Sequence, residues 1–168
     1  IMDLPQTQNK ESSRRLWKEE IIALRNKVEE RFGVKINDDD LRRAIKDKNQ
    51  ERALLKEFYE LSREVPPPMT GLQQLQLLFG AQYKFDQATK LSELRETIAN
   101  IKESYSRGER PVAAEAKRII LTGCPMGGVT EKVTRAIEES GGVVVAYENC
   151  TGAKQIDRQV SESEDPYD

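Results

Sequence analysis

The sequence predicts an α/β fold in which the N-terminal two-thirds of the chain is mostly helical and a parallel βαβ unit follows. Apolar residues recur every three or four positions between residues 12 and 106, which is the spacing of amphipathic helices. After Pro111 the pattern changes to two short apolar runs, 117–122 and 143–147, separated by a helical pattern and a Gly-Gly pair. Such runs are typical of buried strands, and strand, helix and strand in succession form a βαβ unit.

The helical part begins with two long helices. The first spans about residues 12–32 and ends at Gly33, because glycine readily takes the left-handed conformation common after helix C-termini. The second begins at the three aspartates after Asn37, which the positive end of the helix dipole favours, and is stopped by the proline run at 66–68. We expect the apolar face of each helix, including Trp17, to be buried in the core.

Two further helices complete this part, and residues 1–9 precede it as an extended entry segment. Thr70 is a suitable N-cap for a short helix that ends near Phe79. The fourth helix spans about residues 86–106, where apolar residues alternate between steps of three and four, and Gly108 follows it.

The βαβ unit brings the two cysteines of the chain to one edge of the predicted sheet. Cys124 follows the first strand, Cys150 follows the second, and a helix over 129–140 connects the strands by a right-handed crossover. Parallel strands point the same way, so residues that follow their carboxyl ends lie at the same edge, where ligands of open α/β sheets bind. The sequence therefore predicts that Cys124 and Cys150 share one site.

Composition argues against several classes of function. The 168 residues are 33% charged with a net charge of −2, so no basic patch indicates binding to nucleic acid or to a membrane surface. No apolar run approaches the roughly 18–20 residues of a membrane span, and the N-terminus lacks the pattern of a secretion signal. Two cysteines do not make a disulfide framework, so we expect a cytoplasmic protein. The absence of histidine excludes a histidine-based triad or zinc site.

The chain is expected to be a segment of a longer protein. It opens with Ile1 rather than methionine and stops in a charged run, 161–168, which we expect to lead into a helix. Two parallel strands with one crossover helix leave part of the sheet uncovered, and parallel sheets are covered on both faces. Further strands are therefore expected outside this segment.

The residues alone leave several roles open for Cys124 and Cys150. In one interpretation both are small buried residues, and in a second they form a disulfide. In a third, Cys124 is a nucleophilic thiol, because it precedes a helix whose N-terminus would lower its pKa. In a fourth, both bind an iron–sulfur cluster. A reducing compartment disfavours the disulfide, and no histidine is present to act as a base for a nucleophile. A cluster usually takes four protein ligands, so two thiolates would need others from outside these residues.

Neighbouring residues extend this candidate site. Four residues of the loop after the first strand would shape a close, mostly dry pocket for a cofactor: Gly123, Pro125, Gly127 and Gly128. They would alternatively cradle a phosphate, although their spacing is not GxGxxG. Glu148 is a candidate to orient a ligand or transfer a proton, and a solvated loop carboxylate is the alternative.

Several stretches carry a resemblance to a known family. They are Arg118–Pro125, Ile137–Val145, Glu148–Gly152 and Glu164–Tyr167, with Met2–Pro5 and the series from Gly33 to Arg52 upstream. The chain resembles the 2-hydroxyacyl-CoA dehydratase D-component family over nearly its whole length. That family also includes benzoyl-CoA reductase subunits and double-cubane cluster proteins.

The resemblance implies an oxygen-sensitive iron–sulfur protein of anaerobes, with two Rossmann-like α/β domains joined by helices and a cluster between them. An ATP-hydrolysing iron–sulfur activator protein would inject one electron at low potential. In the dehydratases that electron reduces an acyl-CoA thioester to a ketyl radical, which allows loss of the 2-hydroxyl group. In the aryl-CoA reductases the same machinery reduces a ring. A homodimer, or a heterodimer with a related subunit, is the implied assembly.

On this resemblance residues 10–110 would form the helical linker, and 111–168 would begin a Rossmann-like domain that is incomplete here. Cys124 and Cys150 would be ligands of a [4Fe–4S] or double-cubane cluster, with further ligands before Ile1 and after Asp168. Cys124 departs from many dehydratase subunits and favours the double-cubane branch, a reductase of small molecules. The isolated segment would then be inactive. The alternative is a non-enzymatic helical interaction module with structural cysteines.

Overall fold

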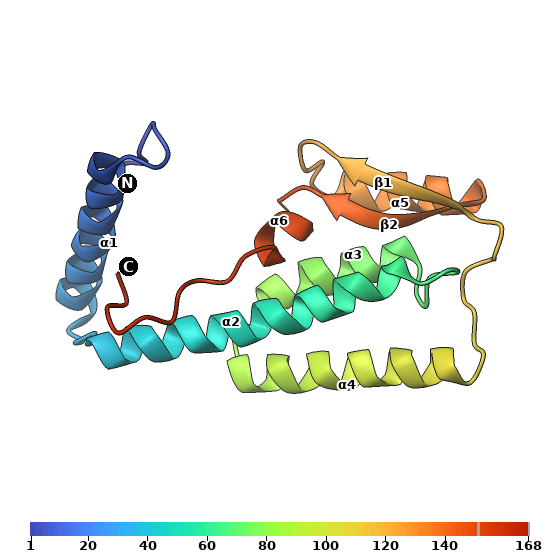
Figure 1. The fold of residues 1–168 in the computed structure, drawn as a ribbon, viewed down its shortest axis with the longest axis horizontal. Helices are drawn as coiled ribbons and strands as arrows, with labels where there is room; N and C mark the ends of the chain where they lie inside the picture. Colours follow the sequence, from blue (N-terminus) through green and yellow to red (C-terminus); the bar gives the residue numbers. More distant parts are fainter. Residues whose placement is uncertain (151, 168) are drawn as a thin grey trace. The chain divides into compact units, whose positions relative to one another are not determined.

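The computed structural model describes residues 1–150 and 152–167 (Figure 1). Its elements are, in chain order, α1 (Glu11–Phe32), α2 (Asp38–Glu60), η1 (Leu61–Arg63), α3 (Gly71–Gly80), η2 (Ala81–Tyr83), α4 (Gln87–Ser106), β1 (Lys117–Thr122), α5 (Val129–Glu139), β2 (Gly142–Glu148) and α6 (Ala153–Ile156). The predicted fold class is confirmed: a mostly helical N-terminal part precedes a parallel two-stranded sheet. No helix in the described ranges combines the length and apolar character of a membrane span.

The helices begin where their capping residues predict. Asn37 and Asp40 exchange side-chain bonds with each other's backbone N–H at the start of α2, at 3.1 and 3.0 Å. Thr70 and Gln73 form the same reciprocal capping box at the start of α3. The Asp86 side chain accepts a hydrogen bond from the N–H of Thr89 at the start of α4. These caps satisfy backbone donors that have no partner inside the helix.

The chain divides into two compact units. The first unit comprises residues 1–46 and the tail from Ser161. The tail of this unit is bound by two charged side chains of α1. Asp165 accepts a hydrogen bond from Lys18 at 2.8 Å, and the Tyr167 hydroxyl accepts one from Arg25 at 2.7 Å. Residues 164–167 form bends and turns, and Asp168 lies outside the described residues.

The prediction that Trp17 lies in the core is wrong. Trp17 is 38% exposed, and none of the residues of α1 is buried by the described part of the chain. Leu24 and Phe32 on the same helix are also exposed. The periodicity predicted the helix correctly, but periodicity alone does not show which surface covers the apolar face.

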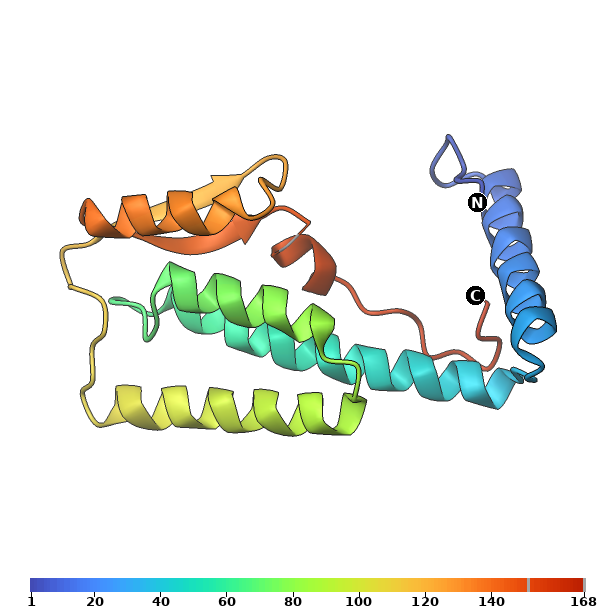
Figure 2. The ribbon, with the colours of Figure 1, turned by 180° about the vertical axis from the view of Figure 1, so that it is seen from behind.

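The second unit, residues 47–160, has its helical core between α2, α3 and α4, which run side by side in both views (Figures 1 and 2). The buried members of this core are Leu55, Phe58, Met69, Leu78, Ala81, Leu94, Ile98 and Ile156. A buried ion pair also joins two helices, because Lys90 on α4 contacts Glu51 on α2 at 3.1 Å. Glu51 accepts a second bond from Lys48 at 2.7 Å, so its buried charge is compensated.

The sheet consists of β1 and β2, paired in parallel with one irregularity. Lys117–Ile119 pair with Gly142–Val144, and Ile120–Thr122 pair with Ala146–Glu148. Val145 therefore has no counterpart in β1 and forms a β-bulge. The extra residue brings Val144 and Tyr147 to the same face, where they pack with Leu75 of α3 and with Ile137 of α5.

The sheet is fastened to α3 at two points. A Cβ placed on Gly71 would lie 2.5 Å from the backbone oxygen of Val144, so the helix and the strand are in direct backbone contact. The buried Tyr147 hydroxyl donates to the carbonyl of Gly71 at 2.9 Å and lies 3.0 Å from the Thr134 hydroxyl. Burial raises the pKa of Tyr147 well above its ordinary value, so the hydroxyl stays a donor.

Replacement of Gly71 by alanine tests the close contact between α3 and β2. The new methyl group would clash with the Val144 backbone, and we expect Gly71→Ala to lower the free energy of unfolding by about 1–3 kcal/mol. Gly80→Ala, at the other end of α3, meets no atom within 4 Å and should raise that free energy by up to about 1 kcal/mol. Urea unfolding of both variants measures the difference, and equal effects would contradict the contact.

Candidate functional site

The two strands end together at one edge, as predicted. Thr122 and Glu148 are the last paired residues of β1 and β2, and Cys124 and Cys150 each follow two positions later. Both strand arrows point to the same end of the second unit in Figure 1. Both thiols are free and exposed, so neither cysteine is a buried core residue. This geometry supports the prediction that the two cysteines share one edge of the sheet.

The bulge at Val145 sets the offset between the cysteines. Before the bulge paired residues are 25 positions apart in the sequence, as Ile119 is from Val144. After the bulge they are 26 positions apart, as Thr122 is from Glu148, and Cys124 and Cys150 have the same separation. Because the offsets agree, the two segments leave the sheet at the same level, and each cysteine is the second residue after the last paired residue of its strand. Bulges are common next to functional sites, where they redirect side chains.

The loop after β1 depends on glycine at two of the four positions proposed to bind a cofactor. Gly123 has φ of 103° and Gly127 has φ of 58°, which are left-handed conformations that favour glycine. Gly128, by contrast, has an ordinary φ of −61° and precedes α5. A Cβ on any of these three glycines would meet nothing within 4 Å, so the loop is open around them. Pro125 lies between the two left-handed glycines and is exposed.

Glu148 lies at the same edge and has two partners. Its carboxylate accepts a hydrogen bond from the Thr122 hydroxyl across the strand pair, and Lys154 of α6 lies 3.4 Å away. The hydrogen bond from Thr122, and then the contact with Lys154, lowers the pKa of Glu148 below its ordinary value. Glu148 is exposed, and its carboxylate is held ionised. This arrangement fits an orienting or proton-accepting group better than a proton donor.

The segment after β2 was not predicted to be helical, but α6 begins three residues beyond Cys150. The Gln155 side chain donates to the carbonyl of Cys150. Gly152 is in contact with β2, since a Cβ there would lie 2.0 Å from the carbonyl oxygen of Tyr147. Thr151, which lies between Cys150 and Gly152 in the sequence, is outside the described residues. Sequence reasoning missed Thr122 and Lys154 as site residues, although a hydroxyl residue directly before Gly123-Cys124 was a usable signal.

The site fits an iron–sulfur cluster only in part. Cys124 and Cys150 offer two exposed thiols at one edge, and thiolate is the ligand such clusters require. Among residues 1–150 and 152–167, no group of three or more Cys, Asp or Glu side chains could hold a metal ion. The described residues therefore supply two ligands of the usual four.

Replacement of Thr122 tests the electrostatics of this edge. Thr122→Val removes the hydrogen bond to Glu148, and we expect the pKa of Glu148 to rise toward its ordinary value. The ionised carboxylate stabilises the fold above its unfolded-state titration range, and that contribution is lost as pH falls through the lowered pKa. Carbon-detected NMR titration of the carboxyl group measures the shift. Thr122→Ser keeps the hydroxyl and should preserve the low pKa, and an unchanged value in Thr122→Val would contradict the interaction.

Comparison with known proteins agrees with the resemblance in the sequence. The family model described as "2-hydroxyglutaryl-CoA dehydratase, D-component" matches residues 1–168. A protein of Escherichia coli (strain K12), named "Putative dehydratase subunit YjiM", is 45% identical over 168 residues. The match covers 100% of this chain and 43% of that relative, so the chain spans less than half of the relative's length. The chain belongs to the 2-hydroxyglutaryl-CoA dehydratase D-component family.

Proposed function

We propose that Cys124 and Cys150 are two ligands of an iron–sulfur cluster in a 2-hydroxyacyl-CoA dehydratase subunit. The observation that carries this proposal is the matched offset of the two exposed thiols beyond the paired residues Thr122 and Glu148. Two thiols at one sheet edge with an open glycine loop beside them suit a bound inorganic group better than a core role. The remaining ligands come from parts of the complete protein outside these residues, and the isolated segment is inactive.

The chain's own residues have distinct roles in this proposal. Cys124 and Cys150 bind as thiolates, and a bound cluster would supply a single electron at low potential. Gly123 and Gly127 take left-handed conformations in the loop around Cys124, and such turns would let backbone N–H groups reach the sulfur of Cys124. The Glu148 carboxylate, held by Thr122 and Lys154, orients the second loop or accepts a proton. Lys154 offsets part of the negative charge at this edge.

The complete protein is proposed to act with partners. An ATP-dependent iron–sulfur activator protein delivers the electron, the substrate is a 2-hydroxyacyl-CoA thioester, and a related or identical subunit completes a dimer. In that protein residues 10–110 form a helical linker, and residues 111–168 begin a Rossmann-like α/β domain. The βαβ unit of β1, α5 and β2 is the part of that domain in the described residues.

A second candidate keeps the cluster but changes the reaction. Cys124 adds a thiol in the loop after the first strand, which favours a larger double-cubane cluster and a small-molecule reductase. The non-enzymatic alternative, a helical interaction module with structural cysteines, has less support, because neither thiol contributes to the buried core.

Iron and sulfide analysis of the complete protein, prepared without oxygen, tests the proposal. We expect absorption near 400 nm, with both iron content and absorption reduced in Cys124→Ala and in Cys150→Ala because each loses a ligand. About eight irons per subunit would favour the double-cubane candidate, and about four the dehydratase. Met126→Leu removes the other sulfur atom of the first loop and should leave the iron content unchanged, since thioethers are not the ligands of these clusters.

Two outcomes would contradict the proposal. A complete protein that stays colourless and iron-free after anaerobic reconstitution would exclude a cluster. A cluster that persists unchanged in both cysteine variants would assign its ligands to other residues and leave these thiols without a metal role.

A further inference from the structure

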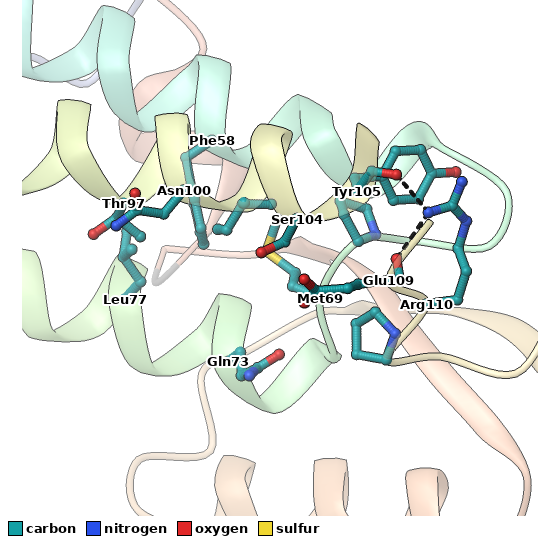
Figure 3. A pocket seen from close by; sticks show the side chains of 13 residues that line it. Phe58, Met69, Gln73, Leu77, Thr97, Asn100, Ser104, Tyr105, Glu109 and Arg110 are labelled. Carbon is teal, nitrogen blue, oxygen red and sulfur yellow. Dashed lines mark hydrogen bonds between the residues drawn. The ribbon is translucent and has the colours of Figure 1, made fainter. Parts of the chain in front are cut away.

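A pocket of the second unit lies apart from the cysteine edge. It has a volume of about 700 Å³ and lies between α3, α4 and the segment that follows α4 (Figure 3). Its floor is apolar, with the buried side chains of Phe58 and Met69 beside Leu77 and Ile101. Small-molecule sites have volumes of about 300–1,000 Å³ and mostly apolar walls, so both the size and the floor suit a ligand.

One wall of this pocket is polar and belongs to a single helix. Thr97, Asn100 and Ser104 of α4 line it at steps of three and four, so their side chains share one face of the helix. These side chains offer both donors and acceptors along the length of the pocket. An elongated ligand could therefore pack one side on the apolar floor and meet hydrogen-bonding groups on the other.

Arg110 lies at one end of the pocket and is held in place. Its guanidinium lies over the ring of Tyr105, 3.6 Å from the ring centroid, and Nη1 donates to the carbonyls of Tyr105 and Glu109 at 2.7 and 2.8 Å. The Tyr105 hydroxyl in turn donates to the carbonyl of Pro66 at 3.1 Å, which fixes the ring. Figure 3 shows Arg110, Tyr105 and Glu109 together at this end.

The charge of Arg110 has no carboxylate partner within the described ranges. Its hydrogen bonds go to neutral carbonyl groups, and they use only Nη1. The nearby carboxylate of Glu109 is already paired with Arg107, at 3.1 Å. A fixed guanidinium with unused donors is a ready partner for an anionic group, which it binds by charge-assisted hydrogen bonds.

We propose that this pocket binds a small amphiphilic acid, with an apolar or aromatic body on the floor of Phe58 and Met69 and one carboxylate at Arg110. The site differs from the cysteine edge, because Pro111 lines the pocket and precedes β1 whereas the cysteines follow the strand ends. The two proposals are therefore independent, and binding should be the same in a Cys124→Ala/Cys150→Ala double variant.

4-Phenylbutyrate is a suitable probe, and 4-phenylbutan-1-ol is its uncharged counterpart. In calorimetric titrations of the complete protein, we expect the acid to bind about tenfold or more tightly than the alcohol, because only the acid pairs with Arg110. Arg110→Gln should remove that preference. Arg95→Gln is the matched control, since Arg95 is an exposed arginine of α4 that does not line the pocket.

A second variant locates the ligand. Ser104→Trp fills the pocket from its polar wall and should abolish binding of both compounds. When the acid is added to the unmodified protein, the NMR chemical shifts that change should be those of residues 69–77 and 97–110. This measurement does not depend on the folding of any variant. Absence of acid binding, equal binding of acid and alcohol, or shifts confined to other regions would each overturn the proposal.

Discussion

The close contact between Gly71 of α3 and Val144 of β2 is the constraint on which the second unit depends. A sheet of two strands is marginally stable by itself and needs a packed face or a covering helix. Here the helix reaches the strand backbone directly, because Gly71 has no side chain to separate them. Tyr147 adds a buried hydrogen bond from the strand to the carbonyl of Gly71. The position of the sheet, and of the two loops that contain the cysteines, therefore depends on its packing against the helices.

Two other contacts reinforce this attachment from the helical side. The Tyr59 hydroxyl accepts from the backbone N–H of Tyr147 at 3.0 Å, which satisfies a donor on β2. Arg118 of β1 donates to the carbonyls of Ser62 and Glu64 at 2.9 Å, so it holds the turn after α2. The strands that end at the cysteine edge are therefore held by the helical part through side-chain hydrogen bonds as well as through the Gly71 contact.

Much of this fold can be predicted from the sequence, because helix caps and strand patterns depend on residues that are close together in the chain. The caps at Asn37, Thr70 and Asp86 determine helix starts through side-chain bonds to nearby backbone groups. The apolar runs before Cys124 and Cys150 predicted two strands, and the parallel connection predicted one common edge.

The features that sequence reasoning missed depend on contacts between distant residues. The exposure of Trp17 depends on which other parts of the protein cover α1, and the sequence pattern of the helix does not contain that information. The pocket beside Arg110 is lined by residues as far apart in the sequence as Phe58 and Pro111, and the bulge at Val145 arises from the pairing of two strands. The pair of Thr122 and Glu148 likewise follows from the register that the bulge creates.

The single unpaired residue in β2 also makes the chain unequally tolerant of changes in length. Residues could be gained or lost in the loop between β1 and α5 while the strands kept their alignment, since such a loop only has to span the distance between them. Loss of one residue at Val145, by contrast, would change the alignment of the strands. Either Tyr147 would turn away from Gly71, or every later residue of β2 would shift by one place relative to Thr122. Insertions and deletions among relatives should therefore be absent from β2.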